Sequence, residues 1–192
     1  NTNRDLLQKI NDLRRRDNPP LTGAQALEMA LSSMVMDKEE HNQLLTRALE
    51  ELQGGDGAKP ETRLMILGSE NDDVELIRLI ESMGGGVVVD ELCTGGRYSL
   101  GKPVDGNGDP LAAIANHYVD RPSSCPHKDL VERRRIPYIM QMVEEYRVDG
   151  VIYLLEKFCE PHGYDLPTLT SMFQERGIPL LLLEVDLTTP AG

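Results

Sequence analysis

Four short, almost uninterrupted apolar runs constrain the fold of this 192-residue chain more than any other feature. They read RLMILG, GVVVDEL, GVIYLLE and PLLLLEVD, at residues 63–68, 86–92, 150–156 and 179–186. Such runs are typical of strands buried on both faces of a parallel sheet. Helical stretches separate them. The pattern therefore predicts the α/β class, with a three-layer Rossmann- or flavodoxin-like sandwich around a four-stranded parallel sheet.

The helical stretches determine how the strands are connected. They cover residues 73–83, 111–119, 130–146 and 166–176. Because crossovers between parallel strands are right-handed, a doubly wound order places the strand that starts at Arg63 beside the one that starts at Val151. Ligands of open α/β sheets bind beyond the carboxyl ends of the strands, so the residues that follow each strand are the candidates for a site.

The beginning of the chain has helical periodicity and predicts a helical segment ahead of the sheet. Proline in NPPLTG ends the first expected helix because it cannot continue the backbone hydrogen bonds. Another helix is expected over residues 38–52, with Asp37 as its cap. The glycine-rich QGGDGAKP predicts a linker at 54–60. The expected division is therefore a helical segment, 1–53, and an α/β domain, 61–192.

Charge and composition exclude several classes of function. With 20 Lys and Arg against 32 Asp and Glu, the formal net charge is -12. Such a surface repels nucleic acid and anionic membranes, so neither is expected as a partner. No apolar run approaches the roughly 20 residues that span a bilayer, and we expect a soluble, cytoplasmic protein. An odd number of cysteines, three, argues against a disulfide framework and leaves thiol, metal or cluster chemistry open.

Cys159 follows the third expected strand directly, in YLLEKFCEPHGYDLP. A lone cysteine at a strand end is commonly a small buried hydrophobic residue. Here Pro161 and Gly163 favour a tight non-helical turn, in which several backbone N–H groups can face one point and stabilise a thiolate or a cluster sulfur. The residues alone leave both interpretations of Cys159 open.

Cys93 follows the second expected strand, in ELCTGGRY, and leaves a similar choice. Gly95 and Gly96 allow the backbone to approach a ligand, and Arg97 can hold a phosphate or a carboxylate; alternatively, the glycines only shape a turn. Cys125, in RPSSCPH, lies in a loop between two expected helices, where a structural role is favoured. The wide spacing of the three cysteines matches no compact zinc or ferredoxin motif.

Other polar residues give weaker signals. GSEND, after the first strand, resembles a phosphate-binding turn but lacks the glycine-rich dinucleotide fingerprint and a P-loop lysine, so no nucleotide site is expected there. His117 and His162 are candidate acids or bases without an identifiable partner. The run ERRR, residues 132–135, is expected on a solvated helix face, with contact to an anionic cofactor tail or a partner subunit as the alternative.

Several segments together resemble one protein family. In chain order they are NTNRDLLQKINDLRRRDNPPLTG, RLMILGSE, VVVDELCTGGRY, DGVIYLLEKFCEPHGYDLP and GIPLLLLEVD. They resemble the C-terminal half of cluster-carrying subunits of the benzoyl-CoA reductase and 2-hydroxyacyl-CoA dehydratase family. The resemblance runs essentially from end to end. SMVMDKEEHNQLL inclines the interpretation toward the benzoyl-CoA reductase branch.

The resemblance implies a subunit of an oxygen-sensitive anaerobic enzyme. Paired related subunits of the family carry [4Fe-4S] clusters, and a separate ATP-hydrolysing iron-sulfur protein delivers single electrons at low potential. In the reductases these electrons enter the ring of an aryl-CoA thioester; in the dehydratases a ketyl radical of a 2-hydroxyacyl-CoA loses its hydroxyl group. Three thiolates hold each cluster, and the motif F-C-[D/E]-P supplies one, which the resemblance assigns here to Cys159.

Two departures from the family pattern leave alternatives open. The chain begins where the second half of such a subunit begins and stops before an arginine-containing C-terminal helix, so the fragment is expected to lack two cluster ligands and to be inactive alone. Alternatively, Cys93, Cys125 and Cys159 form a three-thiolate site themselves. The expected contacts of the acyl-CoA follow two strand ends: Ser69, Thr94, Gly95, Gly96 and Arg97.

Two hypotheses of other classes remain beside the iron-sulfur enzyme. The chain can be a non-catalytic assembly module, whose sheet supplies an interface while a paralogous subunit holds the active cluster. It can also be a Rossmann-like binder of a small ligand, in which the cysteines are structural.

Overall fold

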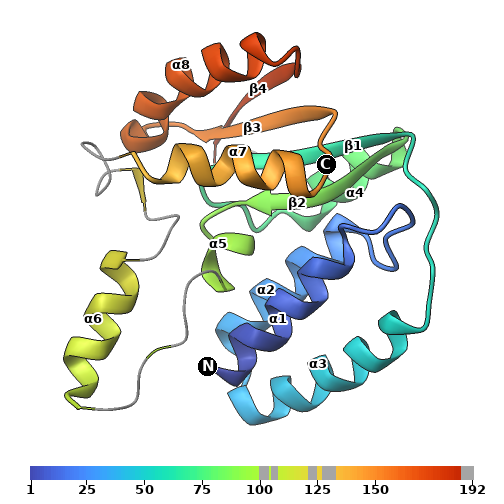
Figure 1. The fold of residues 1–192 in the computed structure, drawn as a ribbon, viewed down its shortest axis with the longest axis vertical. Coiled ribbons are helices and arrows are strands. Elements are labelled where there is room, and N and C mark those ends of the chain that lie inside the picture. Colours follow the sequence, from blue (N-terminus) through green and yellow to red (C-terminus); the bar gives the residue numbers. More distant parts are fainter. Residues whose placement is uncertain (100–103, 105–107, 121–124, 127–132, 187–192) are drawn as a thin grey trace.

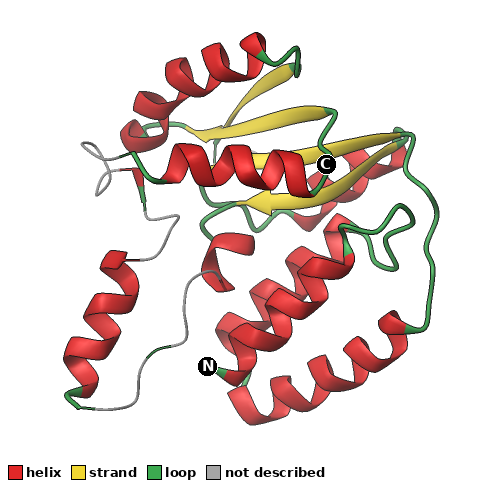
Figure 2. Ribbon diagram, in the orientation of Figure 1, coloured by secondary structure: helices red, strands yellow, loops and turns green. Residues whose placement is uncertain are grey.

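The computed structural model describes residues 1–99, 104, 108–120, 125–126 and 133–186, which form a parallel sheet between layers of helices (Figures 1 and 2). The strands are β1 (Thr62–Gly68), β2 (Gly85–Glu91), β3 (Gly150–Glu156) and β4 (Leu180–Val185). The helices are α1 (Thr2–Leu13), α2 (Gly23–Val35), α3 (Lys38–Gln53), α4 (Val74–Ser82), α5 (Gly96–Ser99), α6 (Pro110–Asp120), α7 (Arg135–Glu145) and α8 (Glu160–Glu175). The predicted class, strand number and leading helical segment are confirmed.

The strand order is β2-β1-β3-β4, with every neighbouring pair parallel. Met65 of β1 lies opposite Val151 of β3, so the predicted pairing of these two strands is confirmed. Because β1 continues to β2 on one side and neighbours β3 on the other, the strand order changes direction beside β1. This is the position at which open α/β sheets form a ligand crevice at their carboxyl ends.

Two hydrophobic cores lie on opposite faces of the sheet. One joins the sheet to α7 and α8, and includes Met65, Ile139, Tyr153 and Phe173. The other joins it to α2 and α4, and includes Leu27, Ile66, Ile77 and Leu154. Both cores draw on β1, which is consistent with a strand covered on both faces. The apolar run of the first strand was therefore interpreted correctly.

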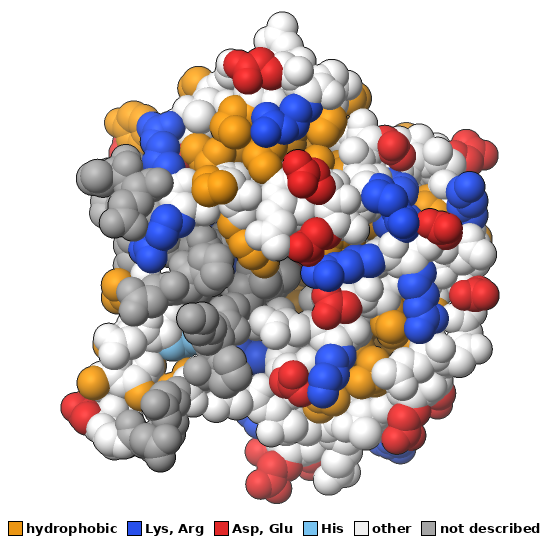
Figure 3. All heavy atoms as spheres, in the orientation of Figure 1, with side chains coloured by type: hydrophobic (Ala, Val, Ile, Leu, Met, Phe, Trp, Pro, Cys, Tyr) orange, Lys and Arg blue, Asp and Glu red, His pale blue; other side chains and the backbone are white. Residues whose placement is uncertain are grey.

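The fourth apolar run differs from this pattern. β4 is an edge strand, and its Leu181 and Leu182 side chains are 54% and 40% exposed. The prediction that all four runs are buried on both faces is wrong for β4, because the helices leave part of this strand uncovered, whereas β2, at the other edge of the sheet, is buried. Orange hydrophobic side chains gather toward the top of Figure 3, where α7 and α8 lie.

The N-terminal helices have a small core of their own, which contains Leu7, Ile10, Leu45 and Leu49. The predicted cap of α3 is confirmed, since the Asp37 side chain accepts hydrogen bonds from the first turn. Within the part of the chain that the structure describes, no helix combines the length and the apolar character that a membrane span needs.

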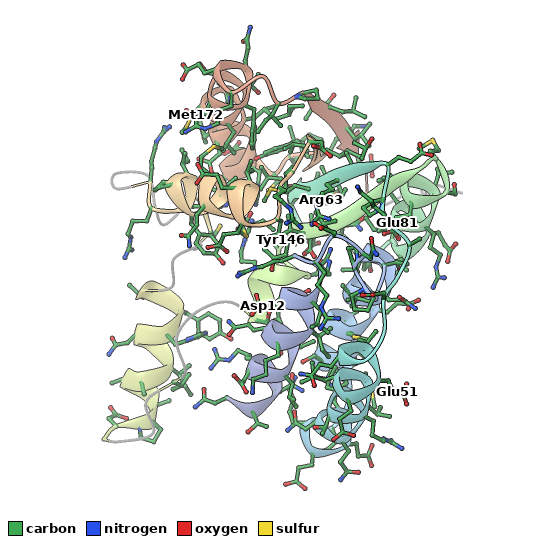
Figure 4. All side chains as sticks on the ribbon, turned by 45° about the vertical axis from the view of Figure 1, so that its right-hand side comes forward. Asp12, Glu51, Arg63, Glu81, Tyr146 and Met172 are labelled. Atoms are coloured by element: carbon green, nitrogen blue, oxygen red, sulfur yellow. The ribbon has the colours of Figure 1, made fainter. Side chains whose placement is uncertain are left out.

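Side-chain hydrogen bonds attach this helical segment to the sheet (Figure 4). Arg63, at the start of β1, donates to the backbone oxygens of Tyr146 at 2.8 Å and Arg14 at 3.0 Å. Glu81 of α4 accepts from the backbone N of Gly23, at the start of α2, at 2.7 Å. The division into two domains at residues 54–60 stays a prediction.

Candidate functional site

Three strands end side by side at one edge of the sheet, and two of the three cysteines follow them. β1 lies between β2 and β3 in a parallel arrangement, so their carboxyl ends meet. Cys93 comes shortly after β2, and Cys159 shortly after β3. We refer to this region as the thiol edge, and both of its cysteines lie where the sequence predicts them.

Cys159 is the N-cap residue of α8, and its side chain makes no capping hydrogen bond. The prediction of a non-helical turn through Pro161 and Gly163 is wrong, because α8 already begins at Glu160. Proline is tolerated in the first helical turn, where N–H groups have no partner within the helix. Pro161 lacks an N–H, and the Glu160 N donates to the Phe158 O at 2.9 Å. Fewer N–H groups are therefore free near Cys159 than expected, although the positive end of the helix dipole remains.

The residue before Cys159 has an unusual backbone conformation. Phe158 has φ 68°, in the left-handed region that bulky residues rarely adopt, and it is 96% exposed. Backbone outliers of this kind concentrate at functional sites. An apolar ring is thus presented to solvent next to Cys159 in the chain.

Cys93 contacts two side chains of the same edge. Its Sγ accepts from Arg97 Nη1 at 3.1 Å and lies 3.9 Å from His162 Nε2. Burial raises the pKa of the Cys93 thiol, and the Arg97 guanidinium opposes this rise. The charges of Cys125 and Cys159 also raise that pKa. Cys125 and Cys159 therefore each lie within electrostatic reach of Cys93.

A buried network of two arginines and two carboxylates lies next to Cys93. Glu91 is 0% exposed, and Arg97 and Arg135 are 2% and 1% exposed. Arg97 Nε donates to Glu91 Oε1 at 2.6 Å, and Arg135 Nε donates to Glu91 Oε2 at 3.2 Å. Arg135 also pairs with Asp165. Burial alone would raise the pKa of Glu91, but the two arginines outweigh it and lower the pKa to about 2.

His162 belongs to the same network and is neutral. It is 1% exposed, its Nε2 lies 3.4 Å from Arg97 Nη1, and the hydroxyl of Tyr153 donates to its backbone oxygen at 2.9 Å. Burial lowers the pKa of His162, and Arg135 and Arg97 lower it further, to about 3. A group with this pKa is a poor general base near neutral pH, and its imidazolium form, which would act as the acid, is not populated there.

The prediction of a solvated helix face for residues 132–135 is wrong for Arg135. Arg133 and Arg134 are exposed, as predicted, and the first residue of the run lies outside the described residues. Arg135 opens α7, and its side chain reaches Glu91 at the end of β2. One signal in the sequence pointed to such a partner, since Glu91 ends an apolar run and a buried carboxylate needs a counter-charge.

The residues expected to contact an acyl-CoA also lie at the thiol edge, where they join its loops. Ser69 Oγ accepts from the backbone N of Glu156 at 3.1 Å. Thr94 Oγ1 donates to the backbone oxygen of Asn71 at 2.7 Å. Each hydroxyl therefore holds the end of one strand to the loop beside it.

The glycine-rich turn is fixed in the same way. A side chain on Gly95 would bring its Cβ within 2.1 Å of Asp90 Oδ1, so the turn passes too close to this carboxylate for any other residue. Gly96 N donates to the same Asp90 oxygen at 2.5 Å. Arg97, next in the chain, directs its guanidinium at Glu91. Contact of these residues with an acyl-CoA stays a prediction.

Comparison with known proteins places the chain in a family. The model of the family described as 2-hydroxyglutaryl-CoA dehydratase, D-component, matches residues 1–191. The chain belongs to this family. The resemblance to the benzoyl-CoA reductase and 2-hydroxyacyl-CoA dehydratase family is thereby confirmed.

Relatives from both branches are similar to the chain. The (R)-phenyllactyl-CoA dehydratase beta subunit of Clostridium sporogenes is 29% identical over 81% of the chain and 41% of its own length. The putative dehydratase subunit YjiM of Escherichia coli is 29% identical over 98% and 50%, and a benzoyl-CoA reductase subunit of Thauera aromatica is 28% identical over 94% and 48%. The chain spans about half the length, or less, of these relatives.

The thiols of the thiol edge fit an iron-sulfur cluster only in part. Cys159 is half-buried, lies at a helix N-terminus and has no capping hydrogen bond, which suits a thiolate ligand. In the described part of the chain, no three Cys, His, Asp or Glu side chains are arranged to hold a metal ion. A three-thiolate site of Cys93, Cys125 and Cys159 therefore gains no support from this geometry and stays a prediction.

Proposed function

We propose that the chain is part of a subunit that binds a [4Fe-4S] cluster through Cys159 and adds single electrons to an acyl-CoA thioester. The observation that carries the proposal is the position of Cys159 between β3 and α8, at the ligand edge of the sheet, in a chain that belongs to this family over residues 1–191. The cluster would supply one-electron chemistry at low potential. Its other ligands would come from residues outside this chain.

The buried network would give the cluster a rigid and electrically balanced support. Arg97 and Arg135 are matched by Glu91 and Asp165, and the neighbouring His162 is neutral. Hydrogen bonds and charges near the sulfur atoms tune the potential of an iron-sulfur centre. A side chain fixed by several buried partners supplies a constant field, which a mobile surface charge does not.

Two reactions can follow the addition of an electron to the thioester. Reduction of the ring of an aryl-CoA is the first candidate, and the segment SMVMDKEEHNQLL favours it. Loss of water from a 2-hydroxyacyl-CoA is the second candidate, favoured by the family description and by the names of the phenyllactyl-CoA and lactoyl-CoA dehydratase relatives. Because these relatives are named as subunits, we propose a paralogous cluster-carrying subunit and an ATP-dependent iron-sulfur electron donor as partners.

Iron and acid-labile sulfide analysis of the anaerobically purified full-length subunit tests the cluster. The wild-type protein should contain both and absorb broadly near ~400 nm. Cys159→Ala should lose most of the iron, whereas Cys125→Ala and Cys93→Ala serve as matched thiol deletions and should retain it. Loss of iron in all three variants would instead favour the three-thiolate site.

Two other results would count against the proposal. A wild-type protein without iron after strictly anaerobic preparation would contradict it outright. Turnover that survives Cys159→Ala in the assembled complex would favour the assembly module, in which the paralogous subunit holds the active cluster.

A further inference from the structure

A pocket lies between the N-terminal helices and α6. Its volume is about 400 Å³, and its lining includes Arg4, Lys38, His117, Tyr98 and Tyr118. No Asp or Glu of the described residues lines it, although acidic residues outnumber basic ones by 32 to 20 in the chain. Figure 1 shows α6 standing apart from the sheet, across from the start of α1. We call this cavity the α1–α6 pocket.

The two cations of the α1–α6 pocket have no carboxylate partner in the described part of the chain. Arg4 Nη1 contacts the ring of His117, with Nδ1 at 3.1 Å, and Arg4 Nη2 donates to Asn1 Oδ1 at 2.8 Å. Lys38 Nζ donates to the Ser33 backbone oxygen, to Ser33 Oγ at 3.0 Å and to the Tyr98 hydroxyl at 3.2 Å. Among the described residues, both positive charges therefore contact only uncharged acceptors.

Several cations elsewhere on the surface are paired with carboxylates. Lys9 pairs with Asp5 at 2.7 Å, and Arg147 pairs with Asp17 at 2.9 Å. The acidic residue next to Lys38 does not compensate it, because the Asp37 side chain accepts hydrogen bonds from the backbone of α3. Among the described residues, Arg16 and Arg176 also lack a carboxylate partner and donate to backbone oxygens. What distinguishes the pocket is that two such cations line one cavity.

The walls of the pocket suit an anion attached to a flat ring. Tyr98 is half-buried, Lys38 Nζ lies 5.5 Å from the centre of its ring, and Tyr118 is 49% exposed. Aromatic faces stack on nucleobases, while lysine and arginine bind phosphate oxygens. Together the residues present phosphate donors and a stacking surface around one cavity.

The short helix α5 connects this pocket to the thiol edge. Arg97 and its neighbour Tyr98 belong to α5, but Arg97 donates to Cys93 at the thiol edge, whereas Tyr98 accepts from Lys38 in the α1–α6 pocket. An acyl-CoA has its thioester at one end and a phosphorylated adenosine at the other. We propose that the α1–α6 pocket binds the phosphorylated adenosine end of this ligand, an assignment that rests on the proposed function for the choice of acyl-CoA.

Isothermal titration of the full-length protein with adenosine 3′,5′-bisphosphate tests the pocket without cluster, thioester or turnover. The wild-type protein should bind this probe and coenzyme A but not pantetheine, and added salt should weaken binding because charges near the surface are screened. Arg4→Gln and Lys38→Gln should each raise the Kd about tenfold, the scale of one charge-assisted hydrogen bond. Lys38→Arg should restore binding.

The control is Lys9→Gln, which removes a cation of α1 outside the pocket and should leave the Kd unchanged. Equal affinity of the wild-type protein, Arg4→Gln and Lys38→Gln for the bisphosphate would overturn the proposal, as would absence of binding. Affinity for inorganic phosphate as high as for the bisphosphate would overturn recognition of the adenosine. The iron content tests the proposed function independently of bisphosphate binding. If the bisphosphate does not bind, the cluster can still be tested, and if iron is absent, binding at the pocket can still be tested.

Discussion

The buried network and the α1–α6 pocket each contain two cations, and they differ in where the counter-charge lies. Arg97 and Arg135 are enclosed and face Glu91, whose oxygens accept from both. Arg4 and Lys38 line a cavity, and no Asp or Glu among the described residues lines it with them. The first pair is committed to the protein, whereas the second pair is available to an anion from outside.

This difference shows that a buried or surface cation can bind an external anion only when no carboxylate of the protein already pairs with it. Arg97 follows two glycines at a strand end, which is the local pattern of an anion site, yet its guanidinium is directed at Glu91. Arg4 has no such local pattern, because α1 places it in a pocket whose other walls come from residues far along the chain. The same residue type therefore acquires opposite roles through tertiary contacts.

The largest expected effect comes from removing the shared carboxylate of the network. Glu91→Gln leaves Arg97 and Arg135 buried with too little negative charge, and breaking a buried pair in this way costs about 3–5 kcal/mol of the free energy of unfolding. Urea titration monitored by circular dichroism measures it. Glu144→Gln, an exposed carboxylate on α7, is the control and should change that free energy by less than about 0.5 kcal/mol. Equal stability of the two variants would show that the network is not structural.

The second-largest difference in the free energy of unfolding should come from exchanging lysine and arginine, once in the buried network and once in the α1–α6 pocket. Arg135→Lys keeps the charge but loses the planar fork that contacts Glu91 and Asp165, and should cost about 1–3 kcal/mol of the free energy of unfolding. Lys38→Arg, in the α1–α6 pocket, should be nearly neutral because it keeps a positive charge at a site without a carboxylate partner among the described residues. Thermal unfolding measures both. A similar loss in both variants would contradict the distinction between committed and available cations.

Much of the fold could be predicted because its signals are local. The apolar runs of β1, β2 and β3 and the turns between them identify a parallel sheet, and handedness then places β1 beside β3. β4 has an equally apolar sequence, but its exposure depends on how far the helices cover it, since β2 at the other edge of the sheet is buried, and no run reveals this by itself. The sequence does not indicate the start of α8 at Glu160, because Pro161 and Gly163 suggest a turn, although proline is accepted in a first helical turn.

The candidate site could be predicted only as a location. The carboxyl edge and Cys159 followed from strand order and from the resemblance, because both depend on residues next to one another in the sequence. The partners of Glu91 did not, since Arg97 and Arg135 come from different elements and meet it only in the folded sheet. Polar pairing between separate elements, here Glu91 with Arg97 of α5 and with Arg135 of α7, is the part of this site that only the structure supplies.

Neutral substitution of the pocket cations should change stability less than any change in the network. Arg4→Gln removes a charge without a carboxylate partner among the described residues and should alter the free energy of unfolding by less than about 0.5 kcal/mol. Lys38→Gln also loses hydrogen bonds to Ser33 and should cost about 1 kcal/mol. Chemical denaturation of the two variants beside Glu91→Gln makes the comparison direct. Large destabilisation by either would indicate that these cations support the fold and would remove the premise that they are available to a ligand.

The smallest expected effect is on His41, which lies behind the α1–α6 pocket. His41 is 2% exposed, and its Nδ1 lies 2.9 Å from Asn3 Nδ2. Burial lowers its pKa below 6.5, and Lys38 lowers it further. Because the unfolded chain then binds the proton more readily, His41 reduces the free energy of unfolding as the pH falls below about 6.5.

Lys38→Gln should therefore raise the pKa of His41 and weaken this acid-side loss, since one repelling charge is removed. Proton NMR titration of the His41 ring measures the pKa, and Lys9→Gln, away from His41, should leave it unchanged. Binding of adenosine 3′,5′-bisphosphate to the wild-type protein should raise the same pKa, because a phosphate beside Lys38 offsets its charge. An unchanged His41 pKa on saturation with the bisphosphate would place the anion away from Lys38, and would leave the two cations of the α1–α6 pocket without a ligand to explain them.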